Sequence, residues 1–465
     1  MQNSHPGAKP VKLAVVGAGW AGMAAAVEAA GAGHHVTVFE AARTLGGRAR
    51  ALPAMRPDGL PLMLDNGQHI LIGAYTGTLQ LMQRIGLQPE HLLLGLPLAL
   101  PYPDGTGLQT PAWAARWPAP LDAVAAIATA RGWRWGERWS LVRASLNWQR
   151  AGFACEPSLT VAALCASLPT RVMDELIEPL CVSALNLPAR DASAQVFLRV
   201  MRDALFGQGH GRWAASALLL PRTDLGSLLP TAAAGWLARQ HGERVHLRAV
   251  TPVRQLRREN SGWALEGHGW SEHFDRVVWA TAARPAAQAM DGAAQAAQAA
   301  GDASLSGALH HWAECAGSLA FTAITTVYAW APGVRLVAPL LALRADPDAH
   351  GAPAQFVFDR GQLFPGDPAA QGVLAFVISA SVGERDELQA LVLEQARRQL
   401  GLSGLQLIQT VVDKRATFAC TPGLQRPPQA IAPGLLAAGD YVDGPYPATL
   451  EGAVRSGLAA AQALH

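Results

Sequence analysis

Residues 11–48 constrain the possible folds of this chain more than any other stretch. Two apolar runs, at residues 13–16 and 36–39, flank an alanine-rich segment of helical composition. The turn after the first run carries glycines at GxGxxG spacing and the second run ends on an acid: Gly17, Gly19, Gly22 and Glu40. This order predicts a strand, a tight turn, a helix and a second strand, as in α/β domains that bind a dinucleotide.

Each residue of this pattern has a separate task in such a site. Gly17 permits the tight turn, Gly19 lets the backbone approach a pyrophosphate, and Gly22 lets the helix pack close to the strand. The helix N-terminus then presents unpaired N–H groups and a positive dipole end to the phosphates. Glu40 follows at the distance where a carboxylate accepts hydrogen bonds from ribose hydroxyls.

A glycine pair and an arginine come next, at Gly46, Gly47 and Arg48. Such a pair can bring backbone close to a cofactor, and the guanidinium can then lie near phosphate. The alternative is an ordinary glycine turn. The position directly after the ribose-binding acid favours the cofactor-binding role.

A second polar stretch lies between apolar runs at residues 64–75, and it contains Gly67, Gln68 and His69. We assign Gly67 and Gln68 to the cofactor site. A lone histidine is more often structural, but this one lies in a loop bounded by glycines. Two interpretations of His69 therefore stay open, a role near the cofactor and a purely structural one.

The length of 465 residues predicts two domains, and an apolar content of 50% is ample for a large core. The α/β pattern recurs in three separate parts of the chain. We expect a discontinuous dinucleotide-binding domain of residues 1–90, 215–300 and 413–465, with a substrate domain of residues 91–214 and 301–412. A net charge of +2 without a long basic run argues against a nucleic-acid partner.

The five cysteines form no CxxC pair, so we expect reduced thiols, no metal site and a cytoplasmic protein. The first ten residues are polar and have no signal-peptide pattern.

Residues 112–150 hold six of the 14 tryptophans, interleaved with arginines. Aromatic and basic residues together suit a membrane interface or a channel for an apolar substrate. The alternative is a helical region whose tryptophans pack internally.

Several further elements follow from local patterns. Residues 92–110 predict a hairpin, residues 245–256 a strand pair and residues 319–380 an antiparallel sheet. Helices are predicted at residues 286–301 and 384–400. Near the C-terminus a strand closes on Gly439 and Asp440, and Thr449 is the expected N-cap of a last helix.

The fingerprint of residues 11–48, the strand at 277–280 and the motifs at 439–440 and 451–453 resemble the flavin amine oxidase and phytoene desaturase superfamily. The resemblance spans the whole chain. It implies that the dinucleotide is FAD, held by an α/β, Rossmann-like FAD-binding domain with an inserted α+β substrate domain.

The resemblance also implies which residues bind FAD. The backbone of Val253 would meet the adenine. Gly439 and Asp440 would hold the ribityl-phosphate region, and the backbone of Thr449 and Leu450 would approach the pyrimidine edge of the flavin. The adenosine and pyrophosphate would be held by the first fingerprint: Gly17, Gly19, Gly22, Glu40, Gly46, Gly47 and Arg48.

Four stretches are similar to the hydroxysqualene dehydroxylase family of bacterial hopanoid synthesis: residues 65–75, 184–194, 414–418 and 447–457. This family implies reductive removal of a hydroxyl from hydroxysqualene, with hydride from N5 of reduced flavin reaching an allylic carbon as water leaves. One departure is the run at 443–446, where a Thr-Gly-Leu-like sequence is expected. This departure bears on the local contacts beside the flavin, but it does not change the class of protein that the resemblance implies.

The leaving hydroxyl needs a proton, and His69 is the first candidate because a histidine can be tuned near neutral pH. Tyr441 and Asp443 are weaker candidates. The alternative is that flavin and site shape do most of the work while His69 only positions the ring.

Other activities share most of these motifs, namely a polyene desaturase, an amine oxidase and a non-catalytic flavin-binding partner. An amine oxidase with a lysine beside the flavin would depend on Lys414, the only lysine after residue 12. We expect a long apolar isoprenoid substrate, taken from the inner face of the cytoplasmic membrane through peripheral contact of residues 112–150. The electron donor stays open.

Overall fold

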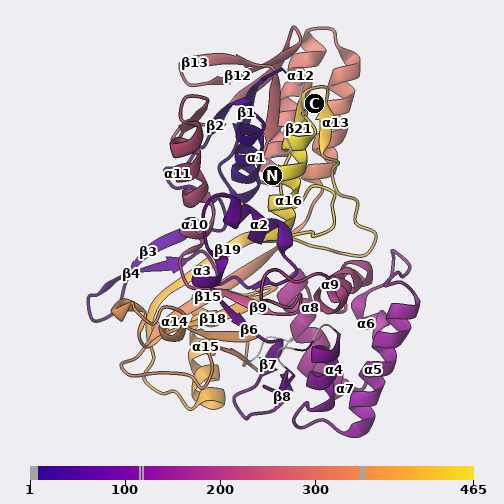
Figure 1. The fold of residues 1–465 in the computed structure, drawn as a ribbon, viewed down its shortest axis with the longest axis vertical. Helices are drawn as coiled ribbons and strands as arrows, with labels where there is room; N and C mark the ends of the chain where they lie inside the picture. The colour runs from indigo at the N-terminus through magenta and orange to yellow at the C-terminus, as the bar shows by residue number, and fades with distance from the viewer. Residues whose placement is uncertain (1–8, 115–116, 118–119, 346–350, 465) are drawn as a thin grey trace.

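The computed structural model describes residues 9–114, 117, 120–345 and 351–464. Residues 115, 116, 118 and 119 of the predicted membrane-facing segment lie outside the described residues. The molecule is elongated, with the nucleotide-binding elements at one end and a second sheet with a group of helices at the other (Figure 1).

The described residues form a central sheet of six strands at the first end. Its members come from three distant parts of the chain, in the spatial order β10 (Val245–Arg248), β2 (His35–Phe39), β1 (Lys12–Val16), β14 (Arg276–Trp279), β21 (Leu435–Ala437) and β20 (Ala430–Ala432). All neighbouring pairs are parallel except β20 with β21. The apolar runs of β1 and β2 are continuous because helices and strands cover both faces.

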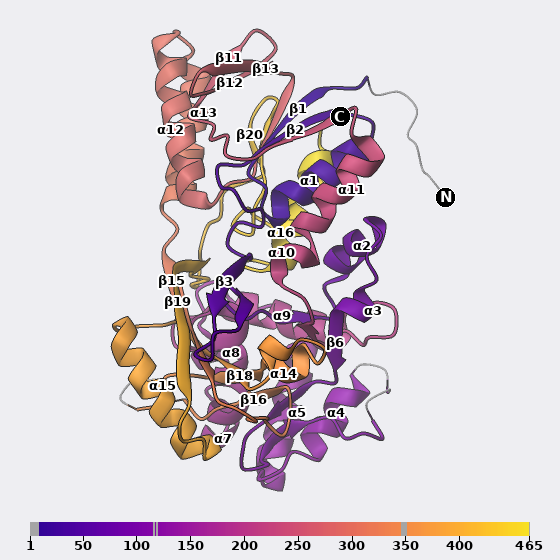
Figure 2. The ribbon, with the colours of Figure 1, turned by 90° about the vertical axis from the view of Figure 1, so that its left-hand side faces the viewer.

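Helices pack closely against one face of this sheet (Figure 2). They are α1 (Trp20–Gly31), α11 (Pro230–His241) and α16 (Leu450–Gln462). The C-terminal helix α16 approaches α1 so closely that a Cβ on Gly457 would lie 2.1 Å from the Ala21 carbonyl oxygen. The first and last segments of the chain therefore form one layer.

A three-stranded antiparallel sheet lies over the other face, made of β11 (Gln255–Glu259), β12 (Gly262–Gly267) and β13 (Trp270–Phe274). It packs through Trp270, whose ring stacks on Phe39 at 5.0 Å between centroids. The predicted strand pair at 245–256 was wrong, because β10 joins the parallel sheet beside β2 whereas β11 pairs with β12.

The second end contains the antiparallel sheet expected for residues 319–380, extended by a later strand. Its order is β16 (Leu340–Ala342), β17 (Phe356–Asp359), β18 (Val373–Ser379), β15 (Phe321–Trp330) and β19 (Gln406–Phe418). Helix α15 (Arg385–Leu400) lies beside this sheet, as predicted, and the short α14 (Arg360–Leu363) follows β17.

The expected domain boundaries at 301 and 413 do not coincide with these elements. Position 413 lies inside β19. Helix α13 (Ala303–Gly317) pairs with α12 (Ala283–Ala299) at the nucleotide-binding end, where Trp312 Nε1 donates to the Pro428 carbonyl at 2.8 Å (Figure 1). The chain enters the second sheet at β15 and leaves it after β19.

Smaller elements connect the two ends. The hairpin β3 (Ala51–Met55) and β4 (Pro61–Asp65) projects from the side. A small sheet joins β5 (Leu71–Ile72), β9 (Leu218–Pro221) and β6 (Leu93–Leu96), next to α2 (Thr76–Arg84), α3 (Pro89–Leu92) and α10 (Leu225–Leu228). The predicted hairpin within 92–110 is confirmed as β7 (Ala99–Pro101) and β8 (Gly107–Gln109).

The helical part of the second end has long members and short ones. The long members are α4 (Leu121–Ala128), α5 (Trp135–Arg150), α8 (Glu178–Leu185) and α9 (Ala194–Phe206). The short ones are α6 (Val161–Leu164), α7 (Thr170–Val172) and a π-helical turn at Met173–Ile177. Two tryptophans of the tryptophan-rich stretch, Trp133 and Trp148, pack internally, whereas others are exposed: Trp113, Trp117, Trp135 and Trp139. The interpretation as a membrane interface or a channel for an apolar substrate stays a prediction.

Within the described part of the chain, we find no helix that combines the length and the apolar character needed to cross a membrane.

Candidate functional site

The glycine turn after β1 has the geometry that the sequence pattern demands. Gly17 has φ +109°, and a Cβ there would lie 2.7 Å from the Ala280 carbonyl oxygen. A Cβ on Gly22 would lie 1.9 Å from the Gly17 carbonyl oxygen, so only glycine allows α1 to begin this close to the turn. In contrast, a Cβ on Gly19 would meet no atom within 4 Å. The turn is therefore tight on its inner side and open at Gly19, where a pyrophosphate would approach the N-terminus of α1.

The glycine pair packs directly on this turn. Gly46 N–H donates to the Ala18 carbonyl at 3.0 Å, and Gly46 and Gly19 form an isolated parallel bridge. Both glycines of the pair have positive φ, +109° at Gly46 and +63° at Gly47. The two glycine-rich segments thus form one cradle of backbone, which fits a bound dinucleotide.

Glu40 closes the rim of the cradle at the end of β2. Its carboxylate accepts hydrogen bonds from the Ala18 and Ala42 N–H groups, both at 2.8 Å. Its backbone carbonyl accepts from Thr251 N–H at 2.9 Å, which brings the link between β10 and β11 alongside. Val253 lies in that link, half-buried. The acid and the predicted adenine contact therefore come from neighbouring segments.

Arg48 joins three distant parts of the chain. Its guanidinium donates to Asp440 Oδ1 and to the Ala416 carbonyl, both at 2.5 Å. Burial lowers the pKa of the Arg48 guanidinium, but the negative charge of Asp440 and its hydrogen bond raise that pKa by more. The net result is a raised pKa. Asn66 Nδ2 donates to the Arg48 carbonyl at 2.9 Å and to Asp413 Oδ2 at 3.3 Å. Arg48 thus links Asp440 and the Ala416 carbonyl to the segment of the glycine pair.

The C-terminal motif delivers a second helix N-terminus to the nucleotide-binding end. Gly439 N–H donates to Ser456 Oγ at 2.8 Å, which fixes the end of β21 against α16. The predicted N-cap is confirmed, because Thr449 Oγ1 accepts from Gly452 N–H at 3.0 Å and α16 begins at Leu450. A Cβ on Gly452 would lie 1.9 Å from the Tyr446 carbonyl oxygen, so this turn requires glycine.

The loop after β4 holds His69 in one orientation. Gly67 has φ +95°, and His69 Nδ1 lies 3.0 Å from the Gly67 carbonyl oxygen. A carbonyl only accepts, so Nδ1 carries the hydrogen and the neutral ring leaves Nε2 as an acceptor. Burial lowers the pKa of His69, and the positive charge of Arg48 lowers it further. Neutral His69 is therefore the predominant form near pH 7.

The residues beside this loop include a buried ion pair that the sequence interpretation missed. Arg360 on α14 lies 3.5 Å from Asp65 Oδ2, and both side chains are buried. Arg360 also donates to Gln68 Oε1 at 3.3 Å and to the Met63 carbonyl at 2.8 Å. Burial raises the pKa of Asp65 to about 6, against the opposing effect of Arg360. No local sequence signal pairs a residue at position 360 with one at position 65.

Asn186, in the stretch at 184–194, makes several hydrogen bonds to distant segments. It ends α8 with φ +53° and is buried. Its amide nitrogen donates to Thr322 Oγ1 at 2.8 Å and to Thr417 Oγ1 at 2.9 Å, and its oxygen accepts from Ala380 N–H at 2.5 Å. One side chain therefore fastens the helical part to β15, β19 and the end of β18.

The two weaker acid candidates lie in opposite environments. Tyr441 is buried, its hydroxyl has no hydrogen-bond partner among the described residues, and burial raises its pKa. Asp443 is 71% exposed and pairs with Arg426 at 2.9 Å. Within the described part of the chain, no hydrogen bond joins either residue to His69. The catalytic roles of the three residues stay predictions.

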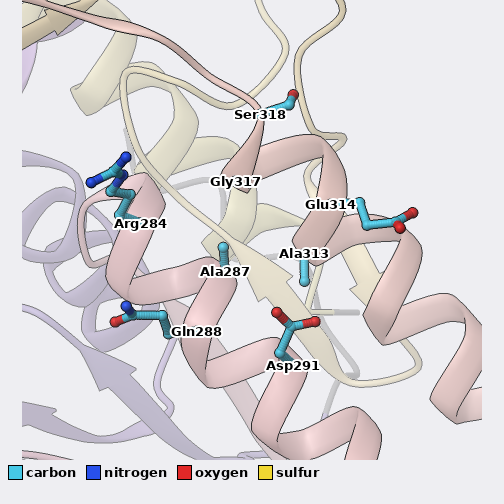
Figure 3. A pocket seen from close by; sticks show the side chains of 8 residues that line it. All are labelled: Arg284, Ala287, Gln288, Asp291, Ala313, Glu314, Gly317 and Ser318. Atoms are coloured by element: carbon cyan, nitrogen blue, oxygen red, sulfur yellow. The ribbon is translucent and has the colours of Figure 1, made fainter.

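A separate open hollow of about 510 Å³ lies between α12 and α13 (Figure 3). Its side chains include Arg284, Gln288, Asp291 and Glu314. None of the predicted site residues lines it. The dinucleotide cradle, not this hollow, is the candidate site.

Glu451 of the C-terminal motif has a structural role, because its side chain caps the start of α2. The carboxylate is fully buried and accepts from Gly77 N–H, Thr78 N–H and Thr78 Oγ1 at 2.9, 2.8 and 2.7 Å. Arg455 Nε donates to it at 2.5 Å. This arrangement fastens the start of α2 to the start of α16.

We expect Glu451→Gln to lower the free energy of unfolding by about 1–3 kcal/mol, because an amide would direct a donor at groups that also donate. Urea unfolding of the variant beside wild type measures this. Glu314→Gln is the control, since Glu314 is 65% exposed, and it should change stability by less than about 0.5 kcal/mol. Equal shifts in the two variants would contradict the capping role.

Comparison with known proteins agrees with this geometry. Residues 20–465 match the family described as flavin containing amine oxidoreductase. The chain is 27% identical to a hydroxysqualene dehydroxylase of Rhodopseudomonas palustris, over 96% of each chain. It is 38% identical to a zeta-carotene desaturase of Synechocystis over 16% of this chain and 15% of the desaturase. The solved structure of cyclohexylamine oxidase from Brevibacterium oxydans superposes with a TM-score of 0.63 at 17% identity, covering 98% and 99% of the two chains.

The fold and the cradle thus define an FAD-dependent oxidoreductase with an amine oxidase-like α/β architecture. The chain belongs to the flavin-containing amine oxidoreductase family. This confirms the predicted fold class and the predicted cofactor. The individual contacts to FAD, including those of Val253, Thr449 and Leu450, stay predictions.

Proposed function

We propose that this protein removes the hydroxyl of hydroxysqualene reductively, giving squalene and water, as a step of squalene and hopanoid biosynthesis. The observation that supports this most strongly is the likeness to a hydroxysqualene dehydroxylase over 96% of both chains. The likeness to a zeta-carotene desaturase spans only 16% of this chain.

The proposed reaction breaks one C–O bond and forms one C–H bond. Reduced FAD supplies a hydride when bound, and it must be reduced again by an electron donor after each turnover. The hydroxyl leaves with one proton as water. The protein must supply that proton, hold a long apolar chain and keep water from the allylic cation.

His69 is the proposed proton donor, acting through Nε2. The Gly67 carbonyl fixes the ring by accepting from Nδ1–H, so Nε2 is the atom free to gain and deliver a proton. Burial lowers the pKa of His69, which makes the imidazolium a stronger acid but a scarcer one near neutral pH. Arg48 repels the protonated ring and so favours delivery of the proton.

We expect the rate of the single-turnover reaction to rise as pH falls, with a midpoint below the ordinary histidine pKa of 6.5. The protonated form is the active one, and it accumulates only below the lowered pKa. His69→Ala should slow turnover by about 10²–10⁴-fold with FAD retained, and should remove this pH dependence. The control is His310→Ala, since His310 is exposed on α13. Full turnover in His69→Ala would leave His69 with a positioning role only.

Anaerobic addition of hydroxysqualene to the photoreduced protein tests the proposed activity. Flavin reoxidation together with squalene formation supports the dehydroxylase. Reduction of oxidised flavin by a polyene would instead indicate a desaturase, and absence of any spectral change would indicate a non-catalytic flavin protein. An amine oxidase is disfavoured, because Lys414 is exposed on β19.

The proposed substrate is a long isoprenoid that partitions into bilayers. We therefore propose that the protein works at the cytoplasmic face of the membrane as a peripheral protein.

A further inference from the structure

Helices α4 and α5 lie at the end of the molecule away from the six-stranded sheet (Figures 1 and 2). Both helices carry large apolar side chains that are exposed. Trp135 and Trp139 lie one turn apart on α5 and are 76% and 66% exposed. Leu121 and Val124 lie one turn apart on α4 and are also exposed. Trp113 and Trp117, which precede α4 in the chain, are exposed as well, and we call these six residues together the aromatic patch. Isolated exposed apolar residues need no explanation, but a concentration of this kind marks an interaction surface.

The patch is held together by defined contacts. Arg138 bridges the two helices, because its guanidinium donates to the carbonyls of Ala128 and Ala130, each at 2.8 Å. The same guanidinium lies 4.8 Å from the centroid of the Trp135 ring. The rings of Trp113 and Trp117 contact each other edge to face at 4.9 Å. Beneath the patch, Trp133 is buried and donates to Glu175 at 2.8 Å, so the helices have a fixed base.

The exposed charged side chains within residues 120–150 are all arginines. Arg131, Arg134 and Arg143 are exposed. Two acids of the same segment are sheltered. Asp122 is buried and accepts from Ser216, and Glu137 accepts from the N–H of Arg134. This surface therefore combines tryptophan rings with exposed arginines, none of which forms an ion pair with a described residue, and it complements an anionic lipid interface.

We propose that the aromatic patch is the surface by which this protein docks on a bilayer of anionic phospholipid, with Trp135 and Trp139 entering the headgroup region. Indole rings favour that region because each has an apolar body and one N–H donor. The flanking arginines would meet lipid phosphate. This inference rests on the proposed function for its biological purpose, since an isoprenoid substrate resides in bilayers, but docking is measured without turnover.

Co-sedimentation of the FAD-loaded protein with phosphatidylglycerol vesicles tests the proposal. We expect wild type to bind, and Trp135→Ser/Trp139→Ser to lose about tenfold or more of its vesicle partitioning. The control is Val337→Ser/Val382→Ser, which removes two apolar side chains that are 89% and 78% exposed elsewhere. Arg131→Gln/Arg143→Gln should reduce the preference for phosphatidylglycerol over phosphatidylcholine.

Three results would overturn the proposal. The first is wild-type protein that stays in the supernatant, and the second is tryptophan variants that bind vesicles as well as wild type does. The third is wild-type protein that self-associates in sedimentation velocity but does not bind vesicles, with the self-association abolished by the tryptophan substitutions. That result would assign the patch to a second copy of the chain. Loss of vesicle binding with unchanged turnover of detergent-dispersed hydroxysqualene separates docking from the proposed activity. Absence of turnover in a vesicle-binding protein would remove the proposed function and leave the docking surface.

Discussion

Gly22→Ala is expected to reduce the FAD content of the purified protein at least tenfold. Its Cβ would lie 1.9 Å from the Gly17 carbonyl oxygen, so either the turn or the start of α1 must move. Either movement misaligns the N–H groups that would meet the pyrophosphate, and every 1.4 kcal/mol lost there is about a tenfold loss of affinity. Flavin absorbance per polypeptide, followed by titration of the apoprotein with FAD, measures the effect.

Two other glycines provide matched controls for this prediction. In Gly19→Ala the added Cβ would meet no protein atom within 4 Å, so the stability of the apoprotein should stay within about 0.5 kcal/mol of wild type. The affinity for FAD should still fall, because the methyl group would stand where the pyrophosphate approaches. Gly292→Ala, inside α12 with open space around it, should leave FAD binding unchanged and stabilise the helix by about 0.5–1 kcal/mol. Full FAD content in both Gly19→Ala and Gly22→Ala would refute the assignment of the cradle.

Arg360→Met is expected to lower the free energy of unfolding by about 3–5 kcal/mol, because it leaves the buried Asp65 carboxylate without its cation. The substitution also removes donors from the Met63 carbonyl and Gln68. Urea unfolding near neutral pH measures the loss. Arg190→Met is the control, since Arg190 is 65% exposed in a surface ion pair, and it should cost less than about 0.5 kcal/mol.

The pH dependence of this loss tests its electrostatic origin. Burial already raises the pKa of Asp65 to about 6, so its contribution to stability is full below the unfolded pKa of 3.8 and is lost as pH rises through about 6. Without Arg360 the folded pKa rises further. The deficit of Arg360→Met should therefore be smaller at pH 5 than at pH 8. Asp65→Asn/Arg360→Met should recover part of the stability, since an amide oxygen can still accept from Leu225 N–H. A deficit independent of pH would point to packing instead.

The sequence by itself determined the nucleotide-binding segment. The requirement at Gly22 is local, because its Cβ would meet the Gly17 carbonyl oxygen five residues earlier. The neighbour that crowds Gly17 is the distant Ala280 carbonyl, and a Cβ on Gly19 would meet no atom within 4 Å. The cap at Thr449 is likewise local, since an N-cap bonds to a backbone group three residues away. Strand-type and helical residue patterns also predicted the second sheet and α15, because such patterns lie in consecutive residues.

Only the tertiary structure decided which distant groups meet. Arg48 with Asp440, Asp65 with Arg360 and Glu451 with the start of α2 are pairs separated by hundreds of residues, and nothing local selects one partner among many. The same reason explains the strand pair that was wrong at 245–256, since the local sequence indicates two strands but not which sheet receives each of them.

Tertiary packing likewise divided the tryptophans into a buried base and an exposed patch. In contrast, the contact of His69 Nδ1 with the Gly67 carbonyl is local, because the two residues are two positions apart. Composition identified the aromatic and basic character of residues 112–150, but the direction of each side chain depends on what packs beneath it. Long-range contacts decide how deeply each titratable group is buried and which group it pairs with. Burial and pairing in turn shift the pKa of the group and so set its charge.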